Sequence, residues 1–398
     1  MATQKDIIDQ AFPETLKILS DLINFQTVSG TSNLKLIEYC EGILSKLGAE
    51  SFKTINESTQ QANLFSTISG KEKINGGGII LSGHTDVVPA SPKEWSSDPY
   101  IATEKDNKIY GRGSCDMKGF IACTLAMAPF FASQNLKKPI HLSYTFDEET
   151  ACLGAPIMLA DLKKRKINYS ACIIGEPTSM KAITAHKGYN EYTTYFTGLS
   201  GHASDPEHGV SAVEYAIRYS NKLMELRNEL KKRKPKKTVF SPPYTTLQIG
   251  KINGGIGTNV IADKCTLDWE ARPIAREDGE FINKNIDDYA EKTLLPEMKK
   301  IYPKANIKKI TVGEVVGFDE KEGSEAVNLV CNLTGDNSKD VVSFGTEAGL
   351  FQEFGISTVV CGPGSIEQAH TVDEFITFDQ LKLCLKMLVD LKERISVR

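Results

Sequence analysis

The apolar residues of the chain recur at two spacings, one typical of helices and the other of buried strands. Two amphipathic helical patterns open the chain, and the second runs from Leu34 to Leu47 and ends at Gly48. Residues 151–166 carry a third helical pattern, as a crossover connection between parallel strands would. Short apolar runs between these patterns predict buried strands of an α/β sheet at Ile79–Leu81, Ile140–Phe146, Ala171–Ile174 and Ser357–Cys361.

The pattern of apolar and polar residues changes near residue 184, where alternating strand patterns replace continuous apolar runs. The order of the predicted elements is βαββαβ, which is a complete ferredoxin-like unit. We therefore expect residues 184–318 to form a second domain inserted into a first one, whose two parts are residues 1–183 and 319–398. The predicted elements are strands at Tyr189–Thr197, Thr245–Ile252, Cys265–Arg272 and Ile307–Val316, and helices at Val210–Leu226 and Ile282–Met298.

Composition and charge narrow the class of protein. The 398 residues exceed what one core usually holds, and 40% hydrophobic with 25% charged residues is ordinary for a soluble globular protein. A net charge of -4 argues against a nucleic-acid partner, so the basic run Lys231–Lys237 is interpreted as a solvated linker. No apolar run approaches the roughly 20 residues of a membrane span. The segment from Met1 to Asp6 lacks the apolar core of a signal peptide, and we expect a cytosolic protein without a membrane partner.

Nine cysteines are scattered along the chain without CxxC spacing. In a chain of this size they predict reduced, mostly buried thiols rather than a disulfide framework. Since they offer no zinc site of their own, the ligands of any metal must be histidine and carboxylate side chains.

Histidine and acidic residues occur where the predicted strands end. His84 and Asp86 follow the first apolar run, and in an extended segment they point the same way. His84 can then bind a metal while Asp86 holds its other ring nitrogen. Taken alone, this short pattern is more often structural.

Further acidic residues and one more histidine lie near the ends of predicted elements. Glycines surround Asp116, whose ordinary role would be a helix N-cap, although a carboxylate at a sheet edge can also bridge two cations. Glu148 and Glu149 belong to three adjacent acids, which are either solvated or offset by a positive charge. Glu176 follows the next apolar run, and His370 lies near the end of the final α/β segment. Such ligands suit a catalytic zinc or a two-metal hydrolase centre.

Several motifs complete the pattern: His84-Thr-Asp-Val-Val-Pro, Trp95, Asp98-Pro99, Tyr110-Gly-Arg-Gly, Asp116-Met-Lys-Gly, Gly201-His-Ala-Ser-Asp-Pro, Gly209-Val-Ser-Ala, Asn259, Arg272-Pro273 and Gly345-Thr-Glu-Ala. In this order they resemble the M20 family of metallopeptidases and deacylases, from about residue 14 to residue 392. The resemblance implies a zinc-peptidase-like α/β catalytic domain with an inserted ferredoxin-like α+β lid domain. It also implies a homodimer formed through the lid.

The resemblance implies a role for each motif residue. Two divalent metal ions, zinc first and cobalt or manganese as alternatives, would share Asp116 as a bridge. The other metal ligands would be His84 and Glu176 at one ion, and Glu149 and His370 at the other.

Catalytic and substrate-binding roles are carried over in the same way. Glu148 would be the general base that activates a metal-bound hydroxide, Asp86 would orient His84, and the peptide after Asp116 would be cis. His202 would assist the oxyanion, in some family members across a dimer interface. Substrate would be bound by Asn259 and Arg272 at its carboxylate, and by Glu347 at a side-chain ammonium.

The expected reaction is hydrolysis of the acetyl amide of an N-acetylated diamino acid. A succinyl-blocked diamino acid or a small peptide is the alternative substrate, because related enzymes for these substrates share the metal centre. Ala348-Gly349 also stands where related sequences often carry proline, which leaves the substrate preference open. A non-catalytic binding protein on the same fold is an alternative of another class, but it would be expected to lack a ligand or the base.

Outside the motifs, ordinary roles are the better interpretation. His141 lies within an apolar strand and is predicted to be a satisfied core residue, and His186 and His208 are predicted to be structural. Cys115 has small, uncharged neighbours and is expected to pack rather than react. Without its motif, Arg272 would be assigned to an ordinary strand ion pair.

Overall fold

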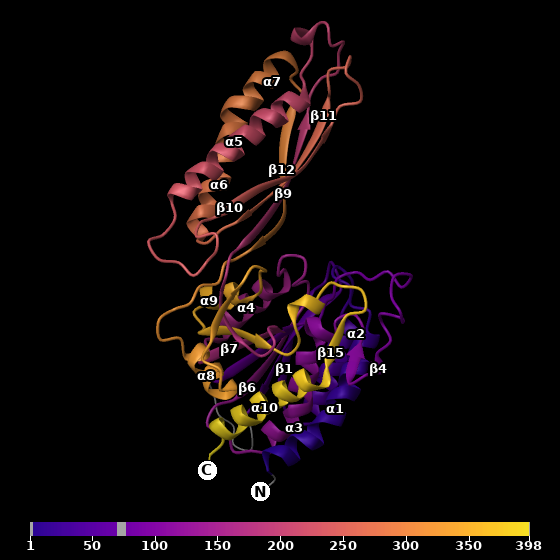
Figure 1. Ribbon diagram of the computed structural model, residues 1–398, viewed down its shortest axis with the longest axis vertical. Helices are drawn as coiled ribbons and strands as arrows, with labels where there is room; N and C mark the ends of the chain where they lie inside the picture. The colour runs from indigo at the N-terminus through magenta and orange to yellow at the C-terminus, as the bar shows by residue number, and fades with distance from the viewer. Residues whose placement is uncertain (1–2, 70–76, 398) are drawn as a thin grey trace. The chain divides into compact units, whose positions relative to one another are not determined.

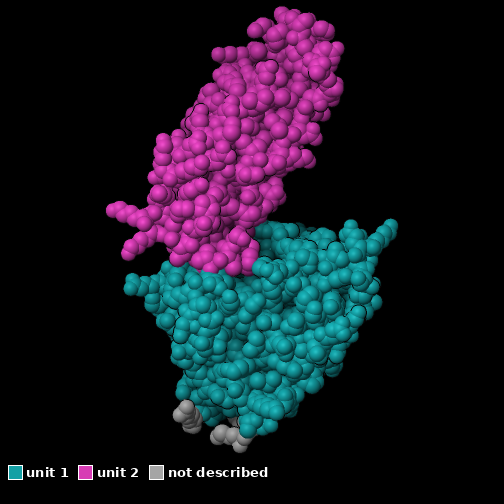
Figure 2. Space-filling view, viewed as in Figure 1, with its two compact units in different colours: residues 1–184, 320–340, 346–398 teal, residues 185–319, 341–345 magenta. Residues whose placement is uncertain are grey.

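The computed structural model describes residues 3–69 and 77–397, and the chain divides into two compact units (Figure 1, Figure 2). Unit 1 comprises residues 1–184, 320–340 and 346–398, and unit 2 comprises residues 185–319 and 341–345. Met1 and Ala2, which begin the N-terminal segment considered above, lie outside the described residues.

Unit 1 is built around a mixed eight-stranded sheet. In sheet order its strands are β1 (Glu50–Asn56), β2 (Gln61–Ile68), β6 (Ile140–Thr145), β3 (Ile79–His84), β7 (Ala171–Pro177), β14 (Thr358–Gly362), β8 (Ala182–His186) and β13 (Lys339–Val342). The neighbours β6, β3, β7 and β14 are parallel, and they are the four strands that the apolar runs predict. Their continuous apolar sequences follow from burial on both faces of the sheet.

Helices cover both faces of this sheet. Alternate residues such as Ile79 and Leu81 of β3 enter the main apolar core, whereas Ser143 of β6 contacts Met158 on the opposite face. The core face is covered by α1 (Gln4–Asn24), α2 (Leu34–Ser45), α3 (Gly119–Ala132), α8 (Glu325–Thr334) and α10 (Phe378–Ile395), of which α1, α3 and α10 pack against one another (Figure 1). Met158 belongs to α4 (Gly154–Arg165), which contacts α9 (Ala348–Glu353).

Among the described residues, one helical segment is long and apolar enough by composition to cross a membrane. It is Ser114–Ala132, whose 19 residues combine the turn Ser114–Lys118 with the apolar helix α3. Most of this segment, 83%, is buried inside the protein, as expected of a core helix.

A small three-stranded sheet joins two distant parts of unit 1. It consists of β15 (Phe375–Thr377), β5 (Lys108–Tyr110) and β4 (Thr103–Lys105). The antiparallel pairing of Phe375 with Tyr110 brings the segment after His370 beside the turn that precedes α3.

Unit 2 has the predicted ferredoxin-like order. Its antiparallel sheet runs β10 (Thr246–Gly254), β11 (Lys264–Arg272), β9 (Tyr189–Thr197) and β12 (Asn306–Val315). Its helices are α5 (Ala212–Lys232), α6 (Arg276–Tyr289) and α7 (Leu295–Ile301). Alternate residues of the strands pack against α5 and α6 in a separate core. The mixed α/β fold with an inserted ferredoxin-like unit is therefore confirmed, although the helix predicted at Ile282–Met298 is two helices joined by a π-helical turn.

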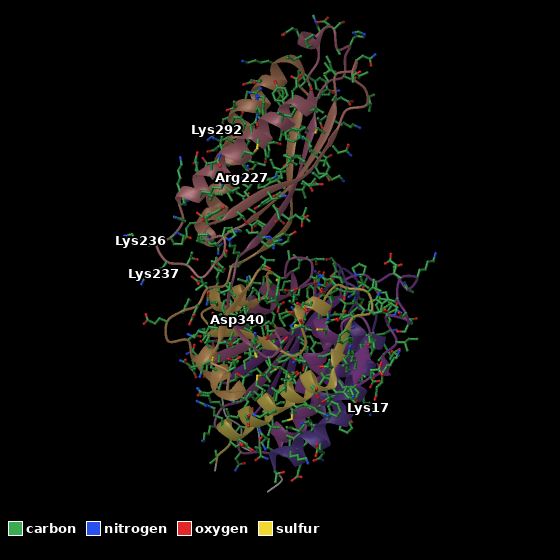
Figure 3. The ribbon with its side chains drawn as sticks, in the orientation of Figure 1. Lys17, Arg227, Lys236, Lys237, Lys292 and Asp340 are labelled. Atoms are coloured by element: carbon green, nitrogen blue, oxygen red, sulfur yellow. The ribbon has the colours of Figure 1, made fainter. Side chains whose placement is uncertain are left out.

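The basic run Lys231–Lys237 is exposed in the last turn of α5 and on the loop that follows it (Figure 3). Arg233 donates to Asp278 at 2.9 Å, while Lys236 and Lys237 extend from the loop toward solvent. This arrangement agrees with a solvated segment.

Candidate metal centre

The predicted ligands of unit 1 come from the ends of its parallel strands. His84 is the last residue of β3, and Glu176 lies next to the end of β7. Glu148 and Glu149 follow β6, and His370 lies on the connection after β14. Since parallel strands present their carboxyl ends at one edge of a sheet, these side chains can gather there.

Asp116 comes from a π-helical turn, Ser114–Lys118, that leads into α3. Asp116 and Met117 have non-helical backbone angles, and the peptide between them is cis, as the resemblance implied. The residue directly before α3 is Lys118, so Asp116 does not have the ordinary N-cap role. Its carboxylate instead faces the two histidines.

The two oxygens of Asp116 face different imidazoles. Oδ1 lies 3.1 Å from His84 Nε2, and Oδ2 lies 3.4 Å from His370 Nε2. Glu176 Oε1 is 3.9 Å from His84 Nε2, and Glu149 Oε2 is 2.9 Å from His370 Nε2. All five predicted metal ligands are therefore brought together, with Asp116 between the two pairs.

Ligand atoms also cluster at a spacing that suits metal ions. One such atom each from His84, Asp116 and Glu149 lies within 4.8 Å of the others, and the same is true of His84, Glu148 and Glu176. The second cluster includes Glu148, to which the resemblance assigns the role of base rather than that of a ligand. The base and the ligands thus line one small space.

The hydrogen bonds of this cluster indicate that it suits a cation. His84 Nδ1 lies 2.9 Å from the Asp86 carbonyl, which can only accept, so the proton of a neutral imidazole is on Nδ1. The lone pair of Nε2 then faces carboxylate oxygens, an arrangement that is repulsive until a positive charge lies between them. Among the described residues, Glu176 Oε1 is buried without a hydrogen-bond partner. A divalent cation would satisfy both groups, and nitrogen with oxygen ligands suits zinc, cobalt or manganese.

The charges of the cluster point the same way. Burial, with neighbouring carboxylates, raises the pKa of Glu148, Glu149 and Glu176. Hydrogen bonds to Asp116 and Glu149 raise the pKa of His370 to about 10. Crowded acids therefore attract protons to this space, and bound cations would replace those protons.

Asp86 holds the strand end that carries the base. Its carboxylate accepts from the backbone N–H of Glu148 at 3.0 Å and of Glu149 at 3.2 Å, and from Ser29 Oγ at 2.7 Å. The carboxylate Oδ1 is 3.5 Å from His84 Nδ1, farther than the Asp86 carbonyl. The backbone carbonyl of Asp86 therefore orients the imidazole of His84, while the Asp86 side chain fixes the loop after β6 that carries Glu148 and Glu149.

Glu148 and Glu347 differ in their surroundings. Glu148 is partly exposed, and the thiol of Cys152 lies 3.6 Å from its Oε1. Glu347 is buried within unit 1, where burial raises the pKa of its carboxyl to about 7. No short sequence pattern predicts the contact of Glu148 with Cys152.

Two of the remaining predicted residues meet at one end of unit 2. His202 forms a backbone bridge with Val260, and Ala203 N donates to the Asn259 carbonyl at 3.1 Å. The N–H of Ser204 donates to His202 Nδ1 at 3.2 Å. Because Nδ1 accepts, the proton of neutral His202 is on Nε2, where it can be donated to an oxyanion.

Arg272 lies at the opposite end of the same sheet. In the β9–β11 ladder Lys264 pairs with Thr197, whereas Ala271 pairs with Asn190. The guanidinium of Arg272 binds Glu270 at 3.2 and 3.3 Å and stacks 4.1 Å from the Tyr189 ring centroid. The described chain therefore does not bring Arg272 and Asn259 together.

Arg272 also lines a cavity of about 500 Å³ within unit 2. Lys187 shares this cavity and donates to the carbonyls of Pro242 and Tyr244. Two cationic side chains thus border the space, which suits an anionic group of a ligand.

The histidines and cysteines outside the motifs make ordinary contacts within the protein. His141 is buried with both ring nitrogens bonded, and His186 is buried against the carbonyl of Lys187. His208 is exposed and pairs with Asp205. All nine cysteines lie in the described part of the chain and are buried free thiols.

Comparison with known proteins identifies the family. The pattern of peptidase family M20/M25/M40 matches residues 80–394. Acetylornithine deacetylase of Pasteurella multocida is 35% identical over 92% of this chain and 94% of its own length.

Solved structures show the same fold. The aminopeptidase PepT of Bacillus cereus has a TM-score of 0.73 at 20% identity, covering 96% of this chain and 98% of its own. A dinuclear metal binding peptidase of the M20 family from Bacillus subtilis has a TM-score of 0.62 at 15% identity, covering 98% and 99%. The expected resemblance is confirmed, the interpretation as a non-catalytic binding protein is not supported, and this chain is an enzyme that belongs to peptidase family M20.

Proposed function

We propose that this enzyme hydrolyses N2-acetylornithine to ornithine and acetate with two bound metal ions. The observation that carries the proposal is the ligand cluster around Asp116, in a chain similar to acetylornithine deacetylase over most of its length. The expected location is the cytosol, and arginine biosynthesis is the expected setting.

The metal ions would be divalent, with zinc as the first choice. His84 and Glu176 would hold one ion, Glu149 and His370 the other, and Asp116 would lie between them. When bound, such a pair polarises the substrate carbonyl and lowers the pKa of a water. The mixed imidazole and carboxylate ligands favour zinc, cobalt and manganese over magnesium or calcium.

Glu148 would carry the proton. Its raised pKa, caused first by burial, suits a carboxylate that takes a proton from water and returns it to the departing amine. The loop that bears it is fixed through its backbone by Asp86. Orientation of the carboxylate then depends on the side-chain contact with Cys152.

The placement of His202, Asn259 and Arg272 supports a site completed by a second copy of the chain. Seven residue steps separate the two ends of β9 that these groups flank, which is about 24 Å at about 3.4 Å per residue. One small substrate cannot span that distance. We therefore propose a homodimer in which one chain supplies His202 and Asn259 and the other supplies Arg272.

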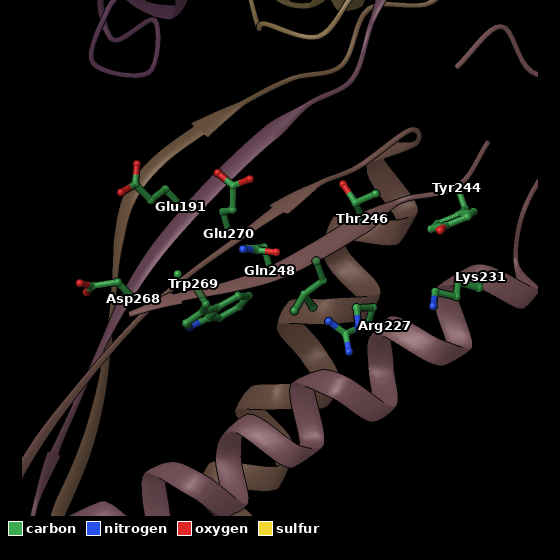
Figure 4. Close-up of a pocket in the computed structure, with 11 residues that line it drawn as sticks. Glu191, Arg227, Lys231, Tyr244, Thr246, Gln248, Asp268, Trp269 and Glu270 are labelled. Atoms are coloured by element: carbon green, nitrogen blue, oxygen red, sulfur yellow. The ribbon is translucent and has the colours of Figure 1, made fainter. Parts of the chain in front are cut away.

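In unit 2, the lid domain of this proposal, the edge of the sheet is the surface that could pair with a second chain. β10 is an edge strand, and its final residues, from Lys251 to Gly254, are exposed together with Ile256. A cleft of about 830 Å³ lies along β10 and is bordered by Arg227 and Lys231 of α5 (Figure 4). Unpaired backbone groups of an edge strand can pair with those of another chain.

Mixing inactive variants tests this arrangement. His202→Ala and Arg272→Ala enzymes, unfolded together and refolded, should recover about one quarter of the wild-type activity, because random pairing leaves one intact site in each heterodimer. The matched control mixes His202→Ala with Asn259→Ala, which remove groups from the same end of the sheet and should not recover. If neither mixture recovers activity, the shared site is excluded.

Substrate and base are tested by kinetics. Zinc-restored enzyme should hydrolyse N2-acetylornithine with a larger kcat/KM than succinyl-blocked diaminopimelate or a dipeptide. The Glu148→Gln variant should keep its zinc and lose at least about 100-fold in kcat, whereas the exposed control Glu94→Gln should retain full activity. Preference for the succinyl substrate would overturn the substrate assignment, and an active Glu148→Gln enzyme would overturn the base.

A further inference from the structure

Glu374 is a fully buried carboxylate that the proposed chemistry does not use. It lies four residues after His370, directly before β15. Its Oε2 accepts from Arg112 Nη1 at 2.8 Å and from Gly113 N at 2.9 Å. Its Oε1 accepts from Cys115 N at 2.8 Å and from Asp116 N at 3.0 Å. A carboxylate has about four lone-pair sites, so all of them are taken by donors of one turn.

The backbone on either side of Glu374 adds to this connection. The N–H of Gly111 donates to the Glu374 carbonyl at 3.0 Å. The neighbouring residues Tyr110 of β5 and Phe375 of β15 pair with each other. The turn that carries Asp116 is thereby joined, residue by residue, to the segment that carries His370. These two residues are ligands from distant parts of the sequence.

Without Glu374, three N–H groups of the turn, those of Gly113, Cys115 and Asp116, would lose their acceptor. Gly113 has a φ of +81°, and a Cβ there would lie 2.5 Å from Val87 Cγ1, so the backbone is already confined. The N–H groups of Gly113, Cys115 and Asp116 converge on one point, as in an anion-binding nest. Removing their acceptor would leave buried donors unpaired, which favours a different backbone course.

Arg112 balances the charge of this carboxylate. The ion pair is buried, with 5% and 1% of the two side chains exposed, and the guanidinium lies 5.1 Å from the Trp95 ring centroid. Arg112 N also donates to the Pro99 carbonyl at 2.7 Å. The Trp95 ring therefore flanks the guanidinium, and the bond to Pro99 fixes the backbone of Arg112, while the guanidinium binds Glu374.

We propose that Glu374, with Arg112 as its counter-ion, is a positioning residue that fixes Asp116 between the two metal sites by holding its backbone N–H. This inference rests on the proposed metal centre. It concerns residues that touch neither metal nor substrate, so its effect should be seen in metal binding before it is seen in catalysis.

Metal affinity tests the proposal directly. Zinc affinity would be measured by competition with a chelator, and the visible spectrum would be recorded after substitution with cobalt. The Glu374→Gln variant offers an amide nitrogen where two donors need an acceptor, and zinc should bind about 10- to 100-fold more weakly, as for other supports of metal ligands. The cobalt bands should shift, since Asp116 is displaced. The matched control is Glu367→Gln, an exposed acid on the same segment.

A second variant covers the case in which Glu374→Gln does not fold. Arg112→Met keeps the three backbone donors of the carboxylate and should weaken zinc binding several-fold with a smaller change of the cobalt spectrum. Wild-type zinc affinity and an unchanged spectrum in the folded variants would overturn the proposal, and so would equal losses in Glu367→Gln. A wild-type enzyme that binds zinc but does not hydrolyse acetylornithine would refute only the substrate assignment, because metal binding is measured without substrate.

Discussion

One imidazole should make unit 1 less stable in acid. His141 of β6 is buried, with Nε2 2.8 Å from the Gly77 carbonyl and Nδ1 3.0 Å from Thr67 Oγ1. Its ring stacks on Phe65 at 5.3 Å and meets Tyr169 edge-on at 5.1 Å. A charged imidazolium would lose its hydration here and gain no acid partner. Burial accordingly lowers the pKa of His141 to about 4.

The sign and size of the effect follow from that pKa. Between pH 4 and the ordinary histidine value of 6.5, the unfolded chain binds this proton and the folded chain does not. Stability therefore rises with pH in that window, and it is lost as the pH falls from 6.5 toward 4. Since one pKa step corresponds to about 1.4 kcal/mol, the loss from pH 7 to pH 4 is about 3 kcal/mol.

The measurement is urea unfolding of metal-depleted protein across this pH range, because metal binding has a pH dependence of its own. In His141→Gln the amide can replace both hydrogen bonds without titrating, so the fall in unfolding free energy below pH 6.5 should be smaller by that amount. His208→Gln is the control, since His208 is exposed. Parallel pH curves for wild type and His141→Gln would refute the reasoning.

Three further changes have defined outcomes. A Cβ on Gly175 would lie 2.0 Å from Phe120 Cγ, so Gly175→Ala should cost about 1–3 kcal/mol in unfolding free energy and weaken zinc binding at the adjacent Glu176. In the control Gly42→Ala the new Cβ meets no described atom within 4 Å, and stability should rise by about 0.5–1 kcal/mol, because alanine is the better helix former within α2. Removal of zinc by a chelator should abolish turnover and lower the melting temperature of unit 1, with about 2.7 kcal/mol restored at a free zinc concentration 100-fold above Kd; an unaltered melting curve would contradict a site in unit 1. Arg272→Lys loses the planar stacking on Tyr189, and KM should rise more than kcat falls; a selective loss of kcat would assign Arg272 another role.

The sequence indicates the core of the fold better than its edges. β3, β6, β7 and β14 were predicted because burial on both faces leaves continuous apolar runs. The edge strand β1 alternates between exposed and half-buried positions, and β4, β5 and β15 have three residues each. Such short or half-exposed strands carry little periodic signal, since tertiary pairing rather than composition holds them in place.

The candidate ligands and one support, Asp86, could be named from motifs, but the other supports could not. His84 and His370 stand in recognisable sequences, whereas the contact of Glu148 with Cys152 depends on a backbone course that no short pattern specifies. Cys152 has a positive φ of 57°, which no cysteine would be expected to adopt from its own preferences. The distance between Asn259 and Arg272 was likewise invisible, because it follows from strand register.

Hydrogen-bond saturation separates the acids of this centre into two groups that composition cannot distinguish. Asp86 and Glu374 have their oxygens occupied by backbone donors, so they hold loops and have little capacity left for a ligand. Within the residues described, Glu176 and Glu347 each keep a buried oxygen without a donor. An unpaired buried oxygen is costly unless something positive or proton-bearing meets it. For Glu176 that group is a metal ion in our proposal, and for Glu347 the same cost favours either a proton or the ammonium of the substrate.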